Sequence, residues 1–99
     1  MITQIEINDQ KLAEFCKRNH IRKLSLFGSV LRDDFRSDSD VDVLVEFELG
    51  EHVGFIRMAC MENELSDMIG RKVDMRTPQD LSRYFRDEVV SSAEVCYAA

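Results

Sequence analysis

Two aspartates, Asp40 and Asp42, stand two residues apart at the start of an apolar run that covers residues 41–47. Side chains alternate faces along a strand, so both carboxylates project from the same side. Two acids on one face repel each other unless a cation lies between them. Proteins usually bind Mg²⁺ through one or two carboxylates together with the phosphates of a substrate. The pair therefore predicts a site for a metal–nucleotide complex.

A Gly28-Ser29 turn lies upstream of these acids, after a run of alternating apolar residues at 21–27. Glycine permits a close approach of the backbone, the serine hydroxyl can donate a hydrogen bond, and a helix N-terminus attracts phosphate. A short helix over residues 30–34 would supply that N-terminus. Gly-Ser alone is a common turn. Asp-x-Asp is the stronger signal, because strands disfavour aspartate and buried acids need partners.

Asp74 is a third candidate, because it lies inside the predicted strand 72–76, where an acid is costly without a partner. Three carboxylates on neighbouring strands can hold two metal ions about 4 Å apart. Such ions clamp an α-phosphate and lower the pKa of an attacking hydroxyl, which is the chemistry of in-line displacement of pyrophosphate. A structural ion pair between Asp74 and Arg71 or Arg76 is the alternative.

Closely spaced acids are also typical of the calcium-binding loop of an EF-hand. Its first three acidic positions would fall on Asp38, Asp40 and Asp42. The sixth position must then be glycine but is Val43, and the twelfth must be glutamate but is Leu49. The pattern therefore fails, and the apolar run after Asp42 is typical of a strand.

Hydrophobic periodicity predicts the elements that would position these residues. A helix begins at an N-cap, Asn8, and ends near Asn19; a second helix covers residues 54–68 and ends at Gly70. Thr77 and Pro78 are typical of a third helix start, and that helix would continue through Leu81, Phe85 and Val89. Together with a last strand near residues 93–97, the order is α-β-α-β-α-β-α-β, which indicates an α/β (α+β) fold with helices packed on a sheet.

Length and composition bound the functional class. The 99 residues predict one domain, 1–99, and the net charge of −6 argues against direct binding of a long nucleic acid. We expect no secretory signal and no membrane span, because no apolar run approaches the required length. The cysteines are odd in number and form no C-x-x-C pair, which favours a reduced, cytoplasmic setting; they are Cys16, Cys60 and Cys96. Neither His20 nor His52 has the spacing of a zinc ligand.

Gly28-Ser29, ten intervening residues and then Asp40-x-Asp42 before an apolar strand resemble the signature of the nucleotidyltransferases related to DNA polymerase β. The short chain resembles the minimal nucleotidyltransferase group, in which Arg32 and Ser39 also match. The resemblance implies a small mixed sheet with the polymerase β-like fold. It also implies that Asp40, Asp42 and Asp74 bind two Mg²⁺ ions. The triphosphate of ATP would then lie on Gly28 and Ser29, with help from Arg32.

The resemblance also implies a partner. Minimal members are commonly paired with an all-helical HEPN toxin, and they silence it by moving AMP from ATP to one of its tyrosines. By this resemblance the chain is an antitoxin and a protein adenylyltransferase that forms a hetero-oligomer with its toxin. Two alternatives stay open: neutralisation of a helical partner by occlusion without catalysis, and nucleotidyl transfer to a small molecule.

Overall fold

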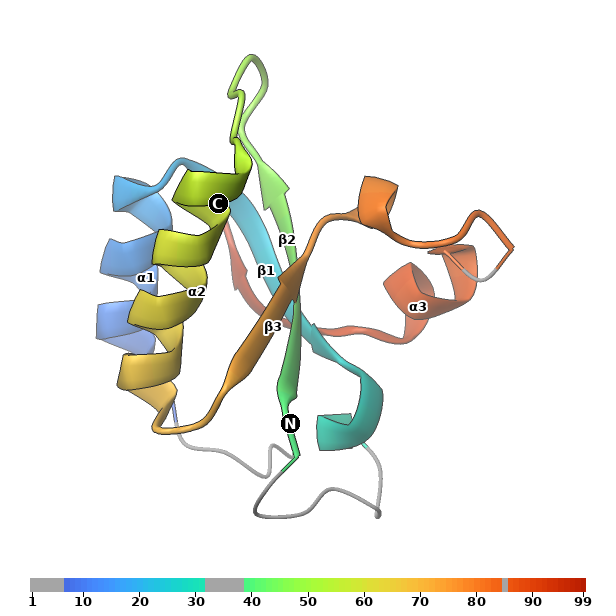
Figure 1. Cartoon of the computed structure of the whole chain (residues 1–99), viewed down its shortest axis with the longest axis horizontal. Helices are drawn as coiled ribbons and strands as arrows, with labels where there is room; N and C mark the ends of the chain where they lie inside the picture. The colour runs from blue at the N-terminus through green and yellow to red at the C-terminus, as the bar shows by residue number, and fades with distance from the viewer. Residues whose placement is uncertain (1–6, 32–38, 85) are drawn as a thin grey trace.

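The computed structural model describes residues 7–31, 39–84 and 86–99, apart from the side chains of Ser29 and Leu31. Three α-helices, four strands and two short 3₁₀ helices make up this part of the chain (Figure 1). In chain order they are α1 (Asp9–Arg18), β1 (Ile21–Phe27), η1 (Gly28–Leu31), β2 (Val41–Phe47), α2 (Phe55–Ile69), β3 (Val73–Arg76), η2 (Pro78–Asp80), α3 (Arg86–Ser92) and β4 (Glu94–Ala98).

The four strands form one mixed sheet in the order β3-β2-β1-β4. β1 pairs antiparallel with both β2 and β4, whereas β2 and β3 are parallel because α2 carries the chain back between them. Helices α1 and α2 lie side by side against one side of the sheet, and α3 lies away from them on the other side (Figure 1). The predicted small mixed sheet with helices packed on it is confirmed.

The core lies between the sheet and the helices α1 and α2. On β2, Val41, Val43 and Val45 are fully buried, whereas Asp42 between them is only half-buried. This alternation places Asp42 on the opposite face from the core. Burying each large apolar side chain contributes about 1.5–3 kcal/mol, so the apolar positions of β2 fix which way its acids point. Met61 and Met75 are buried in this core, and Met58 and Met68 pack against it.

The helix ends agree with the sequence. The Asn8 side chain accepts a hydrogen bond from the Lys11 backbone N–H at 3.0 Å, as expected of an N-cap. Gly70 closes α2 in the left-handed conformation, with a φ of 78°. No helix among the described residues is long and apolar enough to cross a membrane.

One predicted helix is wrong. The chain does not continue as a single helix through Leu81: η2 ends at Asp80, Leu81 is extended, and α3 begins only at Arg86. Asp80 and Thr77 form a reciprocal capping box that completes a single turn. The Leu81 side chain is then buried, and its burial anchors the chain after that turn. The short helix predicted from Val30 also differs, because η1 already begins at Gly28, and residues 32–34 lie outside the described part of the chain.

Strand β3 lies at an edge of the sheet, and side chains occupy its outer donors. The N–H of Val73 donates to Ser66 Oγ at 3.0 Å, and the N–H of Met75 donates to Glu62 Oε2 at 2.8 Å. Ser66 and Glu62 both belong to α2, so this helix holds the strand in place and covers an edge that could otherwise pair with another chain.

Candidate functional site

Two of the predicted acids face each other across neighbouring strands. Asp42 on β2 and Asp74 on β3 are direct partners in the parallel register, and both side chains are half-buried. Neighbouring strands lie about 4.8 Å apart, and partners in register project to the same face. The structure therefore brings Asp42 and Asp74 together on the side of the sheet opposite α1 and α2.

The Gly28 turn lies on the other side of Asp42. β1 ends at Phe27, which is the register partner of Asp42, and Gly28 follows with a φ of 76°. A Cβ atom at position 28 would collide with the Asp42 carboxylate. Glycine is therefore required twice over, once for the left-handed backbone and once for the space that Asp42 fills.

The remaining predicted site residues are placed less fully. Asp40 is exposed and lies just before the start of β2. The Ser29 side chain and all of Arg32 fall outside the description. Among the described residues, no three histidine, cysteine or acidic side chains are placed so that they could hold a metal ion by themselves. Direct binding of metal by Asp40, Asp42 and Asp74 therefore stays a prediction.

The guanidinium of Arg76 lies beside the acidic pair Asp42 and Asp74. The Arg76 Nη2 atom lies 3.3 Å from Asp74 Oδ2. The hydrogen bond to Asp74 raises the pKa of Arg76, and the charges of Asp74, Asp80 and Asp42 raise it further. Sequence alone left Arg71 and Arg76 as equal candidates. The structure gives the ion pair to Arg76, while Arg71 donates to the carbonyl oxygen of Ser39 at 3.3 Å.

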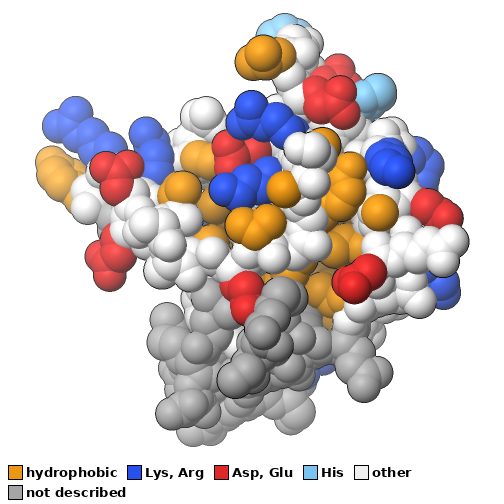
Figure 2. Space-filling view, turned by 180° about the vertical axis from the view of Figure 1, so that it is seen from behind, with side chains coloured by type: hydrophobic (Ala, Val, Ile, Leu, Met, Phe, Trp, Pro, Cys, Tyr) orange, Lys and Arg blue, Asp and Glu red, His pale blue; other side chains and the backbone are white. Residues whose placement is uncertain are grey.

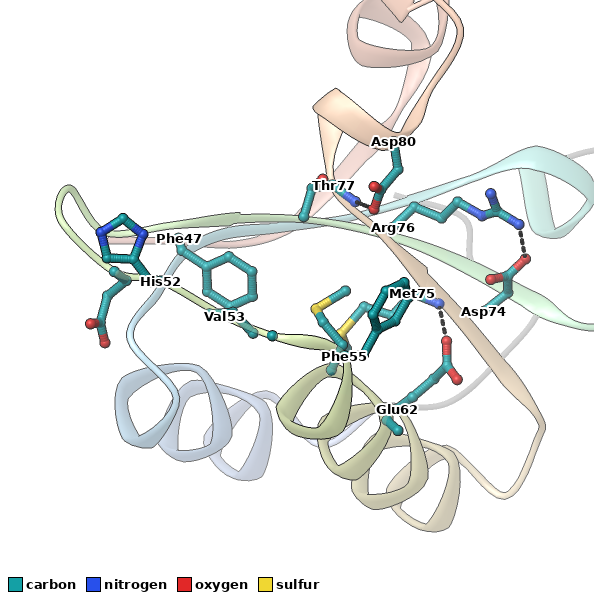
Figure 3. A pocket seen from close by; sticks show the side chains of 14 residues that line it. Phe47, His52, Val53, Phe55, Glu62, Asp74, Met75, Arg76, Thr77 and Asp80 are labelled. Atoms are coloured by element: carbon teal, nitrogen blue, oxygen red, sulfur yellow. Dashed lines mark hydrogen bonds and ion pairs between the residues drawn. The ribbon is translucent and has the colours of Figure 1, made fainter.

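A groove of about 940 Å³ runs from Asp74 along β3 to the connection between β2 and α2 (Figure 3). Asp74, Arg76 and Asp80 form its charged end, and Phe47, Val53, Phe55 and Met58 form an apolar end. Glu62 lines the groove with its carboxylate held by the Met75 N–H (Figure 3). Sequence analysis missed this groove, because its walls come from four separate segments.

The donor set suits a hard cation. Mg²⁺ prefers oxygen ligands and is commonly held by one or two carboxylates plus substrate phosphates, so a complete cage of protein ligands is not needed. Asp42 and Asp74 supply two adjacent carboxylates, and the Gly28 turn lies directly beside Asp42. The residues present thus fit a metal that arrives with a nucleotide.

The other candidate metal ligands do not form a site. His52 is exposed, and His20 Nε2 lies 3.6 Å from Glu51 Oε1 at the surface. All three cysteines are free: Cys16 is buried, Cys60 is exposed and Cys96 is half-buried. Seen from behind, the described surface mixes acidic, basic and hydrophobic side chains and gathers no single basic field on that face (Figure 2).

Comparison with known proteins connects this geometry to a family. Residues 9–96 match the family model described as a nucleotidyltransferase domain. A protein of Methanocaldococcus jannaschii named "Putative protein adenylyltransferase" is 35% identical over 76% of this chain and 78% of its own. The protein adenylyltransferase MntA of Thermococcus cleftensis is 36% identical over 63% of this chain and 61% of its own.

Solved structures agree on the fold. A "putative minimal nucleotidyltransferase" superposes with a TM-score of 0.70 at 30% identity, covering 86% of this chain and 85% of its own. A toxin–antitoxin complex with AMP-PNP gives a TM-score of 0.74 at 19% identity, over 94% of this chain and 75% of its own. A complex of the tri-AMPylated HEPN toxin of Shewanella oneidensis with its MNT antitoxin gives 0.66 at 18% identity, over 92% and 70%.

The family match spans most of the chain, and it includes the Gly28 turn and all three predicted carboxylates. The expected polymerase β-like fold is confirmed by the mixed sheet and by these superpositions. This chain belongs to the nucleotidyltransferase family, and within it to the minimal nucleotidyltransferases.

Proposed function

We propose that this nucleotidyltransferase moves AMP from ATP to a tyrosine hydroxyl of a HEPN toxin, and that it thereby acts as the antitoxin. The observation that carries the proposal is the position of Asp42 between the Gly28 turn and Asp74. A triphosphate seated on Gly28 would place its α-phosphorus near the two carboxylates. The acceptor hydroxyl would then meet the phosphorus beside Asp74.

The reaction assigns a role to each predicted residue. Gly28, Ser29 and Arg32 would hold the β- and γ-phosphates, while Asp40, Asp42 and Asp74 would hold two Mg²⁺ ions. Bound Mg²⁺ neutralises phosphate charge and lowers the pKa of the attacking hydroxyl. The tyrosine oxygen forms a bond to the α-phosphorus as the bond to the bridging oxygen of pyrophosphate breaks. Asp74 would help to remove the hydroxyl proton.

Relatives support the protein acceptor. One structural neighbour holds AMP-PNP in a toxin–antitoxin complex, and another is an MNT antitoxin bound to a tri-AMPylated HEPN toxin. The net charge of −6 suits a protein acceptor better than a nucleic acid. The proposal includes a hetero-oligomer of antitoxin and toxin in the cytoplasm.

Neutralisation by occlusion is a second candidate, and a specific surface favours it. Leu49, Phe55 and Ile56 expose 95%, 96% and 84% of their surface around the connection between β2 and α2. Exposed apolar side chains near one another in the chain can contribute to a surface where a partner protein docks. Contact through them could silence a toxin without chemistry.

Labelled ATP separates these functions. The chain is incubated with Mg²⁺, ATP and the HEPN-type toxin from the same organism, with the label on either the α- or the γ-phosphate. Nucleotidyl transfer moves only the α-label to the toxin, and Asp42→Asn removes it. If the toxin is neutralised equally well by Asp42→Asn and carries no label, occlusion replaces the proposed activity.

A further inference from the structure

We propose that the groove along the outer edge of β3 binds the acceptor segment of the partner protein. We further propose that this segment is basic and presents an apolar or aromatic side chain to Phe55 and Met58. The inference rests on the proposed function and adds to it the place where the acceptor approaches and the chemistry that recognises it.

In-line displacement requires the attacking oxygen to approach opposite the leaving pyrophosphate. The strand order β3-β2-β1 puts the Gly28 turn on one side of Asp42 and Asp74 on the other. With the pyrophosphate on the Gly28 turn, the acceptor must come from the side of β3. β3 is an edge strand, and the groove begins at Asp74 on that side.

The edge of β3 cannot readily accept an added strand. The outward N–H groups of Val73 and Met75 donate to Ser66 and Glu62, and the N–H of Thr77 donates to Asp80 Oδ2 at 3.1 Å. A peptide that added a strand would need these donors. The acceptor segment is therefore recognised by side chains lining the groove, as a loop or helix would be.

The groove lining specifies the chemistry of that segment. Four carboxylates line it, those of Glu51, Glu62, Asp74 and Asp80. Arg57 pairs with Glu51 at 3.8 Å and Arg76 pairs with Asp74 at 3.3 Å, which leaves Glu62 and Asp80 without an ion pair among the described residues. The other end of the groove is apolar, and the Phe55 ring at the rim is 96% exposed. Charge complementarity favours Lys or Arg in the segment, and burial of the Phe55 ring favours an apolar neighbour of the hydroxyl.

Phe55→Ser tests the groove, with Tyr84→Ser as a matched control because Tyr84 is 87% exposed and does not line the groove. Transfer to the full-length HEPN-type toxin is followed at varied toxin and varied ATP. Phe55→Ser is expected to raise the KM for toxin by about tenfold and to leave the KM for ATP unchanged. Phe55→Trp should restore the KM for toxin, and Tyr84→Ser should not change it. Salt should raise the KM for toxin, because attraction between charges weakens with ionic strength.

The outcomes are distinguishable. If the unaltered chain transfers AMP but Phe55→Ser leaves the KM for toxin unchanged, the groove is not the acceptor site while the proposed function stands. An equal rise in the KM for ATP would assign the groove to the nucleotide and overturn the inference. If the unaltered chain transfers no AMP, both the proposed function and the inference fail.

Discussion

The Asp42 carboxylate occupies the space that a side chain at position 28 would need. Gly28 and Asp42 are therefore a matched pair, although 13 residues separate them from one another in the sequence. The antiparallel register between β1 and β2 joins them, because Phe27 and Asp42 are partners. The turn that we propose for phosphate and the acid that we propose for metal thus lie on one surface.

Gly28→Ala should disturb this surface as well as the backbone. Gly50 has a similar φ of 86° with open space around it, so Gly50→Ala carries the backbone strain without the collision. Left-handed strain costs about 1–2 kcal/mol in either variant. We expect Gly28→Ala to lose about 1 kcal/mol more free energy of unfolding, since Asp42 must shift.

Urea unfolding measures this difference, and a transfer assay should show a loss of activity for Gly28→Ala only. Equal losses of stability with full activity in both variants would contradict the pairing of Gly28 with Asp42.

Arg76 should compete with Mg²⁺ for Asp74. Arg76→Gln removes an ion pair that is half exposed, so the free energy of unfolding without metal should change by less than about 1 kcal/mol. Added Mg²⁺ should then raise the Tm of this variant more than that of the unaltered chain. Arg22→Gln is the control, because Arg22 pairs with Glu46 at 3.1 Å, away from the acidic pair. The same Mg²⁺-dependent rise in Tm in all three proteins would show that Arg76 does not compete with Mg²⁺ for Asp74.

Glu62 should stabilise β3 through the Met75 N–H. Glu62→Ala leaves this donor without its partner and should cost about 1–3 kcal/mol of unfolding free energy. Glu62→Gln keeps an acceptor oxygen and should cost less. Glu64→Ala serves as the control, since Glu64 makes a surface ion pair with Arg18, and it should cost under about 1 kcal/mol. Chemical unfolding measures the free energy of unfolding of each variant. Equal losses of this free energy in Glu62→Ala and Glu62→Gln would rule out the hydrogen bond as the cause.

The thiols should differ sharply in reactivity. Burial raises the pKa of Cys16 to about 12, with a smaller contribution from Cys96, whose own pKa burial raises to about 11. A raised pKa leaves less thiolate, the reactive form, so at about pH 8 both thiols should alkylate slowly. Cys60 is exposed and should be labelled first. Peptide mass spectrometry at successive times of alkylation gives the rate at which each cysteine is labelled. Alkylation of Cys16 as fast as Cys60 would contradict the prediction.

Much of the fold was predictable because the local signals agree. The bounds of β1 and β2 match the expected runs, since each is a compact apolar stretch followed by a glycine, Gly28 or Gly50. Asn8 and Gly70 marked helix ends through capping chemistry that is local in the sequence. Asp42 and Asp74 were expected on neighbouring strands, but the register that makes them partners is set by the folded sheet.

The rest depends on contacts between distant segments. Burial of Leu81 ended η2 early, and no local signal reveals where that side chain is buried. Arg71 and Arg76 flank Asp74 at similar separations, so only the folded chain selects Arg76. The groove joins α2, β3 and two connections, which no single motif could indicate.

The mass of the toxin after incubation tests the central claim most directly. The HEPN-type toxin is mixed with ATP, Mg²⁺ and the unaltered chain, Asp42→Asn or Asp67→Asn, where Asp67 is an exposed acid of α2 that does not line the groove. We expect the unaltered chain and Asp67→Asn to add AMP to a tyrosine of the toxin. Asp42→Asn should slow this transfer by at least about a hundredfold. Unmodified toxin in every mixture, or equal modification by Asp42→Asn, would contradict the central claim.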